Sequence, residues 1–458
     1  MPEPSTNDRT WLPLETAQST LIAITALTAA VAPLGLPTMV AVLALVTLAQ
    51  NWREDLSPSA IARIRMRDPA VLAAITFIVF ATASTTWALQ PLYALKSLAQ
   101  AALTGLGAMY VAGTLSRQLR RPGQTRRIRF VRAAPLATLF IGLYFLLEFL
   151  TGNGVTLFFA RNVPGLFDGF ENTFIYDATG GLVGLDESYF NRISAALVLL
   201  TIGIVAALQF WPRRAWGSAF GALVCIGSLA ICLKSGSATA LLAFALSALT
   251  FTLALWSSKR TSRLLQVAYL IAIITAIPLS MLPKALDIDE NPALPPSFRE
   301  RVIIWNDVAG LALERPWLGN GVKSVKFLQI RPKVQSAAEN ASSDSLRTYA
   351  HPHNGYLQVW VELGLVGAAL FAIAGALAIN GIMFLPYAMQ KYALALATGT
   401  LTMLGPGWDL WQPWLIAAIG FGWIALMLLR TEFELADNNP TPSLNAARPL
   451  AGASSSAR

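Results

Sequence analysis

The sequence predicts an all-α protein that crosses a membrane about twelve times. Hydrophobic residues make up 55% of its 458 residues and charged residues only 13%, whereas soluble domains carry about a quarter charged residues. Apolar stretches of about 17 to 25 residues recur, and each is long enough to cross a bilayer as a helix. Because lipid offers no partner to unpaired backbone groups, helices are the expected spanning elements.

The apolar stretches set the expected spans and domains. The spans are placed near residues 18–33, 36–50, 70–88, 93–114, 134–150, 192–210, 217–233, 237–256, 264–281, 355–378, 384–404 and 412–429. Residues 1–17 lack the basic start and cleavage site of a signal peptide, so the first stretch is expected to be retained. The tail 430–458 is predicted to be disordered, because it is rich in Pro, Asn, Ala and Ser from Asp437 onward. Cys225 and Cys232 share one span, where burial is favoured over a disulfide or metal site.

Charge in the loops predicts the orientation. Loops 51–69, 115–133, 211–216 and 257–263 hold 4, 7, 2 and 3 Lys or Arg, and loops 34–35, 89–92 and 405–411 hold none. By the positive-inside rule, the first group and both termini face the cytoplasm. The net charge of +9 is explained by these loops, and nothing in the sequence resembles a nucleic-acid-binding fold.

Two long connections, 151–191 and 282–354, are then expected on the outer side, where long loops usually carry function. The larger one contains a predicted amphipathic helix that ends before Pro316, with Ser297 and Glu300 as its capping box. Its expected apolar stripe comprises Phe298, Val302, Trp305, Ala309 and Leu313. This helix is predicted to lie on the membrane or on the helix bundle.

Aromatic residues mark the outer edge of the last span. Trp408, Trp411 and Trp414 bracket Asp409. This pattern is typical of an interfacial aromatic belt, and we expect a belt here rather than a binding site.

The two histidines of the chain share one tetrapeptide, His351-Pro352-His353-Asn354, at the outer start of the tenth span. Asn354 is a good N-cap, which would place His353 just ahead of a helix. The electropositive helix N-terminus disfavours imidazolium and would keep His353 neutral, as a base must be. The alternative, a merely polar helix entry, is equally consistent with these residues.

Three cations are expected on the same side as the histidines. Arg192 opens the sixth span, Lys234 ends the seventh, and Arg301 lies on the amphipathic helix. Together they suit a diphosphate-bearing lipid, because cations neutralise charge that develops on a leaving phosphate. Taken singly, Arg192 and Lys234 are more typical of interfacial snorkelling than of ligands, and Arg301 alone is consistent with a solvated helix charge.

Two further ionisable residues are weaker candidates. Glu362 falls about two turns into the tenth span, where a charge is costly and by default functional. His351 is a possible assistant to His353, although Pro352 forces an extended start and the two rings need not face one point.

The residues around His353 resemble the O-antigen ligase and O-antigen polymerase superfamily. His353-Asn354 is followed by Gly364 and Gly367, and it is preceded by Arg301 and by Pro316-Trp317-Leu318-Gly319-Asn320-Gly321. These motifs cover about 70 residues, continuing to about residue 370. Glycines alone would mean little in a membrane helix, but the ordered set is specific.

The resemblance implies a metal-independent glycosyltransferase without a cofactor, in the bacterial inner membrane and with its active site facing the periplasm. The donor would be a glycan on undecaprenyl diphosphate, and the acceptor a sugar hydroxyl on lipid A-core or on another glycan. His353 would be the general base, and Arg301 with Arg192, and Lys234 as a third candidate, would hold the diphosphate.

Two departures from the family pattern leave alternatives open. Ala368-Ala369 stand where the ligase branch often has Thr-Thr, which keeps a repeat-unit polymerase of O-antigen or exopolysaccharide as the nearest alternative. The family's arginine in a Ser-Arg-x-Ala-Leu start is absent from Ser237–Leu241, and we expect Lys234, on the same helical face as Ala238, to replace it. A lipid-linked sugar transporter is disfavoured, because no halves repeat and the charges gather at one face. A non-catalytic scaffold is disfavoured because it would not need both histidines beside the cations.

Overall fold

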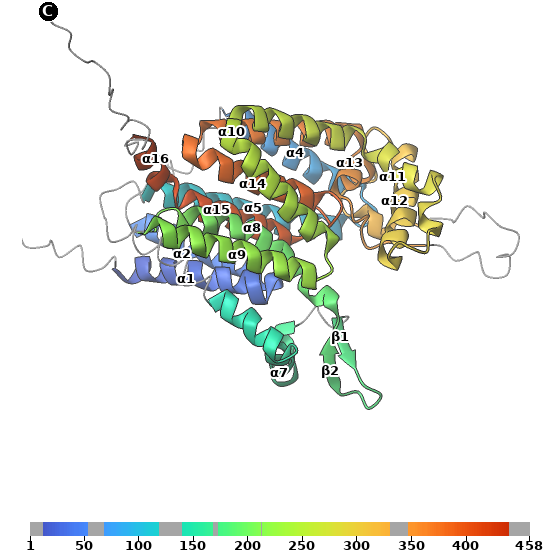
Figure 1. The fold of residues 1–458 in the computed structure, drawn as a ribbon. Helices are drawn as coiled ribbons and strands as arrows, with labels where there is room; N and C mark the ends of the chain where they lie inside the picture. Colours follow the sequence, from blue (N-terminus) through green and yellow to red (C-terminus); the bar gives the residue numbers. More distant parts are fainter. Residues whose placement is uncertain are drawn as a thin grey trace, which may run out of the picture.

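The structure is a computed structural model that describes residues 12–53, 68–118, 140–167, 173–211, 213–329 and 347–438. Most of the basic loops 51–69 and 115–133, and the tail beyond residue 438, lie outside these ranges. The described chain is an elongated helical bundle, with α11 and α12 at one end and α16 at the other (Figure 1).

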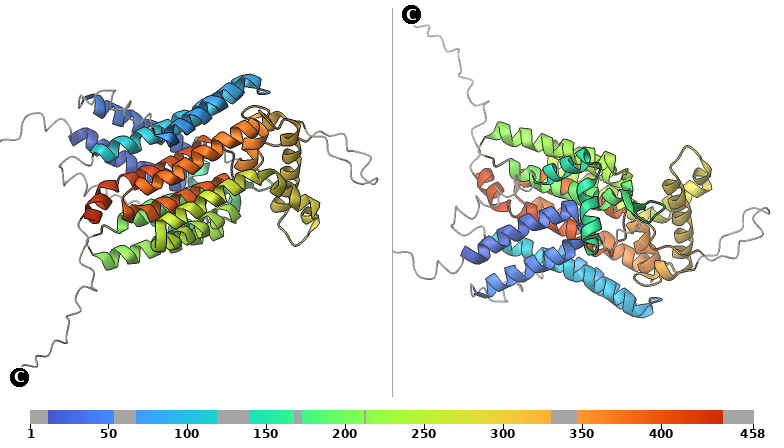
Figure 2. Two further views of the ribbon diagram at one scale, coloured as in Figure 1. Left: turned by 90° about the horizontal axis from the view of Figure 1, so that it is seen from above. Right: turned by 90° about the horizontal axis from the view of Figure 1, so that it is seen from below.

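Most of the bundle consists of long helices that run along one common direction (Figure 2). They are α1 (Leu12–Val31), α2 (Leu36–Arg53), α4 (Pro69–Ser84), α5 (Pro91–Gln118), α8 (Phe190–Leu208), α9 (Arg214–Lys234), α10 (Ala238–Ile274), α13 (Gly355–Gly381), α14 (Tyr387–Leu404) and α15 (Pro413–Met427). Shorter elements are α7 (Gly154–Asn162), α11 (Ala276–Ala285), α12 (Pro296–Glu314) and α16 (Arg430–Asn438).

Helices long and apolar enough to cross a membrane are confirmed, and the count of twelve stays a prediction. Eight helices in the described ranges are long and apolar enough to span, or nine if the bent pair Phe140–Leu150 and Gly154–Asn162 counts as one span. Two predicted spans fall largely within α10, which is interrupted only at Ser257, with φ −161° and ψ 100°. The two predicted spans are therefore two helices joined at Ser257. The connection is shorter than the predicted loop 257–263, because all of it except Ser257 is helical, and the Ser257 hydroxyl accepts from Arg260 N–H.

The core is built around helices that are covered on most sides. Phe190–Leu208 is buried over 78% of its most apolar stretch. It packs with α1, α14 and α15 in the largest apolar cluster, which includes Ile193, Leu199, Leu396 and Phe421. α14 lies inside the bundle, with Leu394 and Leu396 fully buried. The helices toward lipid keep exposed apolar side chains, as expected where the solvent is hydrocarbon.

The connection 151–191 adds a feature that the all-α prediction did not include. Strands β1 (Phe174–Tyr176) and β2 (Leu182–Leu185) form an antiparallel hairpin, whose turn is fixed by Asp177 accepting from Thr179 and Gly181 N–H. The strands have three and four residues, too short for an alternating pattern to stand out in the sequence.

The amphipathic helix of the larger outer connection is present as α12, but its start and its buried face differ from the prediction. Pro295 is the N-cap and no side chain caps the helix, so Ser297 lies inside the first turn and the predicted capping box is wrong. Val302 and Ala309 are buried as predicted, whereas Phe298 and Leu313 are exposed. The buried face also contains Ile304, Val308 and Ala312, and it packs on α13, so α12 lies on the bundle.

The chain beyond the last span also begins differently from the prediction. α16 continues as a helix to Asn438, with Phe433 buried and its ring centroid 4.8 Å from that of Phe210. Asp437 accepts from Tyr387 N–H at 2.7 Å and from Ala388 N–H at 3.4 Å, and so caps α14. These contacts order the first nine residues of the tail that was predicted to be disordered.

A break in α13 at Gly364 is filled by the turn of residues 316–321. Gly364 has φ 64° and ψ −162°. Leu365 and Val366 N–H donate to the carbonyls of Pro316 (2.7 Å) and Trp317 (3.2 Å). In return, Asn320 and Gly321 N–H donate to the carbonyls of Val361 (3.0 Å) and Glu362 (2.7 Å). The turn thus satisfies the backbone groups that the break leaves free, and it ties the outer connection to α13.

This exchange explains the glycines of the motif. A Cβ on Gly364 would lie 2.4 Å from the carbonyl carbon of Trp317, and one on Gly319 would lie 2.4 Å from that of Glu362. Both residues also have positive φ, which L side chains rarely adopt.

We predict that Gly364→Ala lowers thermal stability markedly. The left-handed conformation alone costs about 1 to 3 kcal/mol for a residue with a side chain, and the overlap with Trp317 adds to that. Melting followed by size-exclusion fluorescence in detergent measures the effect. Gly227→Ala on α9 is the control, because nothing lies within 4 Å of the added Cβ, and it should melt at or above the wild-type temperature. Equal melting of both variants would contradict this account.

Candidate active site

The predicted cap places His353 at the start of α13. Asn354 Oδ1 accepts from Tyr356 N–H at 3.1 Å and Leu357 N–H at 3.2 Å, which confirms it as the N-cap. Gly355 lies against α14, where its N–H donates to Gly405 and an added Cβ would lie 2.4 Å from Leu404 O. His353 comes immediately before this fixed helix entry and has φ 52°.

The bond made by the His353 ring selects its tautomer. His353 Nδ1 lies 3.3 Å from the carbonyl oxygen of Gly407. Because a carbonyl oxygen only accepts, Nδ1 carries the proton of the neutral ring. The lone pair is then on Nε2, the nitrogen that is able to accept a proton.

The two histidines lie against each other. Their ring centroids are 4.0 Å apart, and His353 N–H donates to His351 Nδ1 at 3.3 Å. Burial, the neighbouring His351 and the charge of Arg301 lower the pKa of His353 to about 4. Burial also lowers the pKa of His351. Both rings are therefore neutral at physiological pH, and His353 has the protonation state of a base.

Arg301 reaches the same point from α12. Its Nη1 donates to the carbonyl of Pro406 at 3.1 Å, the residue before the Gly407 carbonyl that binds His353. Thr239 at the start of α10 also donates to Pro406 O, at 3.2 Å. Burial lowers the pKa of Arg301, yet a guanidinium remains charged throughout the physiological range.

Of the other predicted cations, Arg192 acts electrostatically on His351, whereas Lys234 lies beside Phe149. Asp409 acts to raise the pKa of His351, and the charges of Lys323, Arg301 and Arg192 act to lower it, so all four groups lie within electrostatic range of the ring. Lys234 is exposed at the end of α9, with Nζ 6.0 Å from the ring centroid of Phe149. A break at Gly236 separates it from Ala238 on α10, so the predicted shared helical face is wrong.

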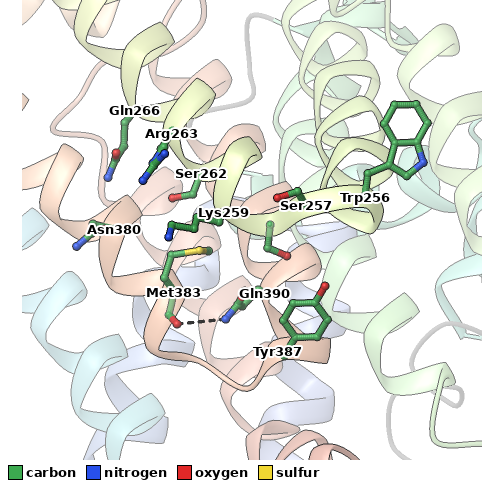
Figure 3. Close-up of a pocket in the computed structure, with 11 residues that line it drawn as sticks. Trp256, Ser257, Lys259, Ser262, Arg263, Gln266, Asn380, Met383, Tyr387 and Gln390 are labelled. Carbon is green, nitrogen blue, oxygen red and sulfur yellow. Dashed lines mark hydrogen bonds between the residues drawn. The ribbon is translucent and has the colours of Figure 1, made fainter.

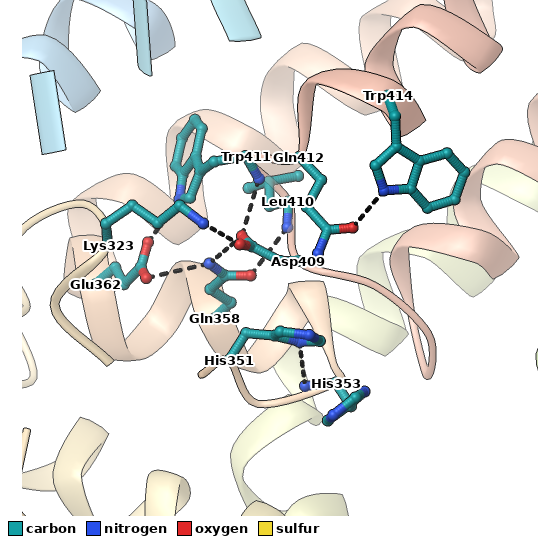
Figure 4. A network of polar contacts seen from close by, with 10 residues as sticks. All are labelled: Lys323, His351, His353, Gln358, Glu362, Asp409, Leu410, Trp411, Gln412 and Trp414. Atoms are coloured by element: carbon teal, nitrogen blue, oxygen red, sulfur yellow. Dashed lines mark hydrogen bonds and ion pairs between the residues drawn. The ribbon is translucent and has the colours of Figure 1, made fainter. Parts of the chain in front are cut away.

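A buried polar network lies next to the histidines and was not predicted (Figure 4). Lys323 and Asp409 form an ion pair. Gln358 Nε2 donates to Asp409 at 2.8 Å and to Glu362 at 3.1 Å, and its Oε1 accepts from Leu410 N–H at 3.0 Å. Trp411 Nε1 donates to Glu362 at 2.6 Å. Glu362 is thus a member of this network, one helical turn beyond Gln358.

The ion pair fixes the charges of its two members. Burial acts to raise the pKa of Asp409, but Lys323 and the bonds from Gln358 and Trp411 outweigh it, so the pKa is lowered. Burial acts to lower the pKa of Lys323, but the charge of Asp409 outweighs it, so the pKa is raised. Both groups are therefore ionised, and their charges cancel inside the protein.

The predicted aromatic belt around Asp409 is wrong. Trp411 and Trp414 are 5% and 4% exposed, and Asp409 is 2% exposed. The reason is that the segment 405–412 turns inward onto α13, where Asp409 and Trp411 find polar partners. Lys323 was missed because it has no motif of its own. Two features of the sequence point to it: its position two residues after Gly321, and Asp409 as the one acid of the segment 405–411 with which it could pair.

The site therefore contains His353, His351, Asn354 and Arg301, with Arg192 nearby and Glu362 in the adjoining network. Within the described ranges, no group of three or more His, Cys, Asp or Glu side chains is placed to hold a metal ion. The arrangement offers a neutral base, a neighbouring guanidinium and several positive charges, which are the groups needed to activate a hydroxyl beside an anionic leaving group.

Comparison with known proteins supports the same family. The sequence model described as O-antigen ligase matches residues 223–372, which include Arg301, His353 and Glu362. The family resemblance is confirmed. The matched region also contains Lys323 and Gln358.

Relatives carry a consistent name. The chain is 29% identical over 227 residues to a putative polysaccharide ligase of Rickettsia bellii, covering 49% of this chain and 52% of that protein. It is 28% identical over 150 residues to the putative polysaccharide ligase RP358 of Rickettsia prowazekii, covering 32% of this chain and 36% of that protein. The chain thus matches about half the length of these relatives or less.

We predict that breaking the Lys323–Asp409 pair from one side destabilises the protein strongly. Asp409→Asn leaves a buried ammonium without its counter-charge, at a cost of about 3 to 5 kcal/mol. The double variant Lys323→Met/Asp409→Asn should recover part of the loss. Thermal melting of the single and double variants measures this coupling.

The control is the half-exposed pair Arg430–Glu434. Glu434→Gln should cost about 0.5 kcal/mol or less. Additive losses in the Lys323 and Asp409 variants would contradict a coupled ion pair.

Proposed function

We propose that this protein is a ligase-type glycosyltransferase of the bacterial inner membrane. It transfers a glycan from undecaprenyl diphosphate to a sugar hydroxyl, such as one on lipid A-core, on the periplasmic side. The observation that carries the proposal is a neutral His353 with its Nε2 lone pair available, beside Arg301 and within the O-antigen ligase region.

In the proposed reaction, His353 Nε2 takes the proton of the acceptor hydroxyl. The acceptor oxygen attacks the anomeric carbon of the donor, and the bond between that carbon and the diphosphate oxygen breaks. Undecaprenyl diphosphate leaves with the bonding electron pair, and direct attack inverts the anomeric configuration. The products are the extended glycan, the lipid diphosphate and a proton held on His353.

The cations have the complementary role in this scheme. Arg301 and Arg192 bind the diphosphate and stabilise the charge that grows as the sugar bond breaks. The charges of both arginines act on His351, which supports this role. Lys234, exposed at the end of α9 beside Phe149, has no assigned role in this scheme.

The proposed orientation is supported by the basic loops and by the fold. The segments expected to be outside meet at one end of the bundle: Leu89 N–H donates to Ser324 Oγ at 3.4 Å, and Asp409 pairs with Lys323. α16 lies at the opposite end (Figure 1). The positive-inside rule assigns the α16 end to the cytoplasm and the histidine end to the periplasm.

The nearest alternative is a polymerase that uses the same donor and a growing glycan as acceptor. The residues around His353 serve either reaction, because both require a deprotonated hydroxyl and a stabilised diphosphate. The names of the relatives favour the ligase.

We predict that His353→Ala lowers glycan transfer by about 100-fold or more, as expected for loss of a general base. The assay uses the full-length chain reconstituted with an undecaprenyl diphosphate-linked glycan and two acceptors, lipid A-core and free repeat unit. Product on lipid A-core supports the ligase, and product on the repeat unit alone identifies the polymerase.

Arg301→Gln should also lose transfer, whereas Arg315→Gln is the matched control, because Arg315 is exposed and follows the end of the same helix. Full activity of His353→Ala, or movement of donor lipid across the bilayer without product, would refute the proposal.

A further inference from the structure

A polar pocket lies at the end of the bundle opposite the histidines. It has a volume of about 480 Å³ and forms where α10 breaks at Ser257 and where α13 passes into α14. The other ends of these helices reach the candidate active site, at Thr239, Asn354 and Leu404. The pocket is therefore a helix length away from that site.

Two cations line this pocket. Lys259 and Arg263 are four residues apart on the second half of α10 and share one helix face. In Figure 3, Lys259 lies among the side chains of Ser262, Met383 and Gln390. Among the residues that the structure describes, neither cation forms an ion pair with a carboxylate. The pocket is therefore a concave site of positive charge.

The walls of the pocket are polar and held in place. Gln390 Nε2 donates to the carbonyls of Met383 and Leu385, each at 3.1 Å. Gln266 Nε2 donates to Ala376 O at 3.0 Å. Asp437, on α16, is bound to the N-terminus of α14, including Tyr387 of the pocket lining. Ser262 and Asn380 add a hydroxyl and an amide to the lining.

We infer that this pocket binds the phosphate-bearing headgroup of an anionic membrane phospholipid. Basic pockets between transmembrane helices on the cytoplasmic side suit such headgroups, and the positive-inside rule assigns the basic segment 257–263 to that side. Trp256 and Phe384 beside the pocket are 82% and 80% exposed. Exposed aromatic side chains at the ends of apolar helices belong at the headgroup level, so the pocket opens where lipid phosphates lie.

The test is native mass spectrometry of the full-length chain in neutral detergent, titrated with phosphatidylglycerol or phosphatidylcholine of identical acyl chains. A cation that contacts the phosphate of an anionic lipid contributes about fivefold to binding. Lys259→Gln/Arg263→Gln should therefore weaken phosphatidylglycerol binding about 25-fold, and phosphatidylcholine should bind weakly throughout. The charge-conserving Lys259→Arg/Arg263→Lys should keep binding near the wild-type level.

Arg260→Gln is the matched control, because Arg260 is exposed on the same helix but does not line the pocket. It should bind phosphatidylglycerol within about twofold of wild type. Equal binding by the double Gln variant, equal loss in Arg260→Gln, or equal affinity for phosphatidylcholine would overturn the inference. Inorganic phosphate that competes fully at lipid concentrations would instead identify a soluble phosphate site and would overturn the lipid assignment.

Discussion

The short segment between α14 and α15 holds the candidate site together through adjacent backbone carbonyls. Pro406 O accepts from Arg301, and Gly407 O binds His353 Nδ1. Two residues later, Asp409 joins Lys323 and Gln358 in the buried network. A base from α13 and a guanidinium from α12 are thereby fixed next to each other by a third element. The segment itself is anchored by an ion pair that is costly to break from one side.

Much of the fold follows from the lengths of the apolar stretches. The helices were located well, because a bilayer requires long apolar segments. The connections were harder to predict, because hydropathy does not show that two spans can be joined through a single non-helical residue such as Ser257. The start of α12 was missed because Pro296 occupies the first turn, which displaces Ser297 from the cap.

The site was predictable where a residue's role is local, and not where it depends on a distant partner. Asn354 was identified as a cap because a cap interacts with the next turn of its own helix. The inward turn of Asp409 and Trp411 depends on Gln358 and Glu362, about 50 residues earlier, and on Lys323. Lys234 does not share a helical face with Ala238, because the intervening Gly236 has positive φ and lies where α9 has ended.

The central claim is that buried surroundings keep His353 neutral beside Arg301 and its neighbouring cations. The pH profile of kcat/KM for glycan transfer tests it most directly, since it reports the pKa of the free enzyme's base. Because the neutral ring is the active form, transfer should stay level as the pH falls from 8 to about 5, and should decline as it approaches the His353 pKa of about 4. Recovery of activity after return to pH 7 separates titration from unfolding. A reversible acid limb near 6.5, the ordinary histidine value, would contradict the account.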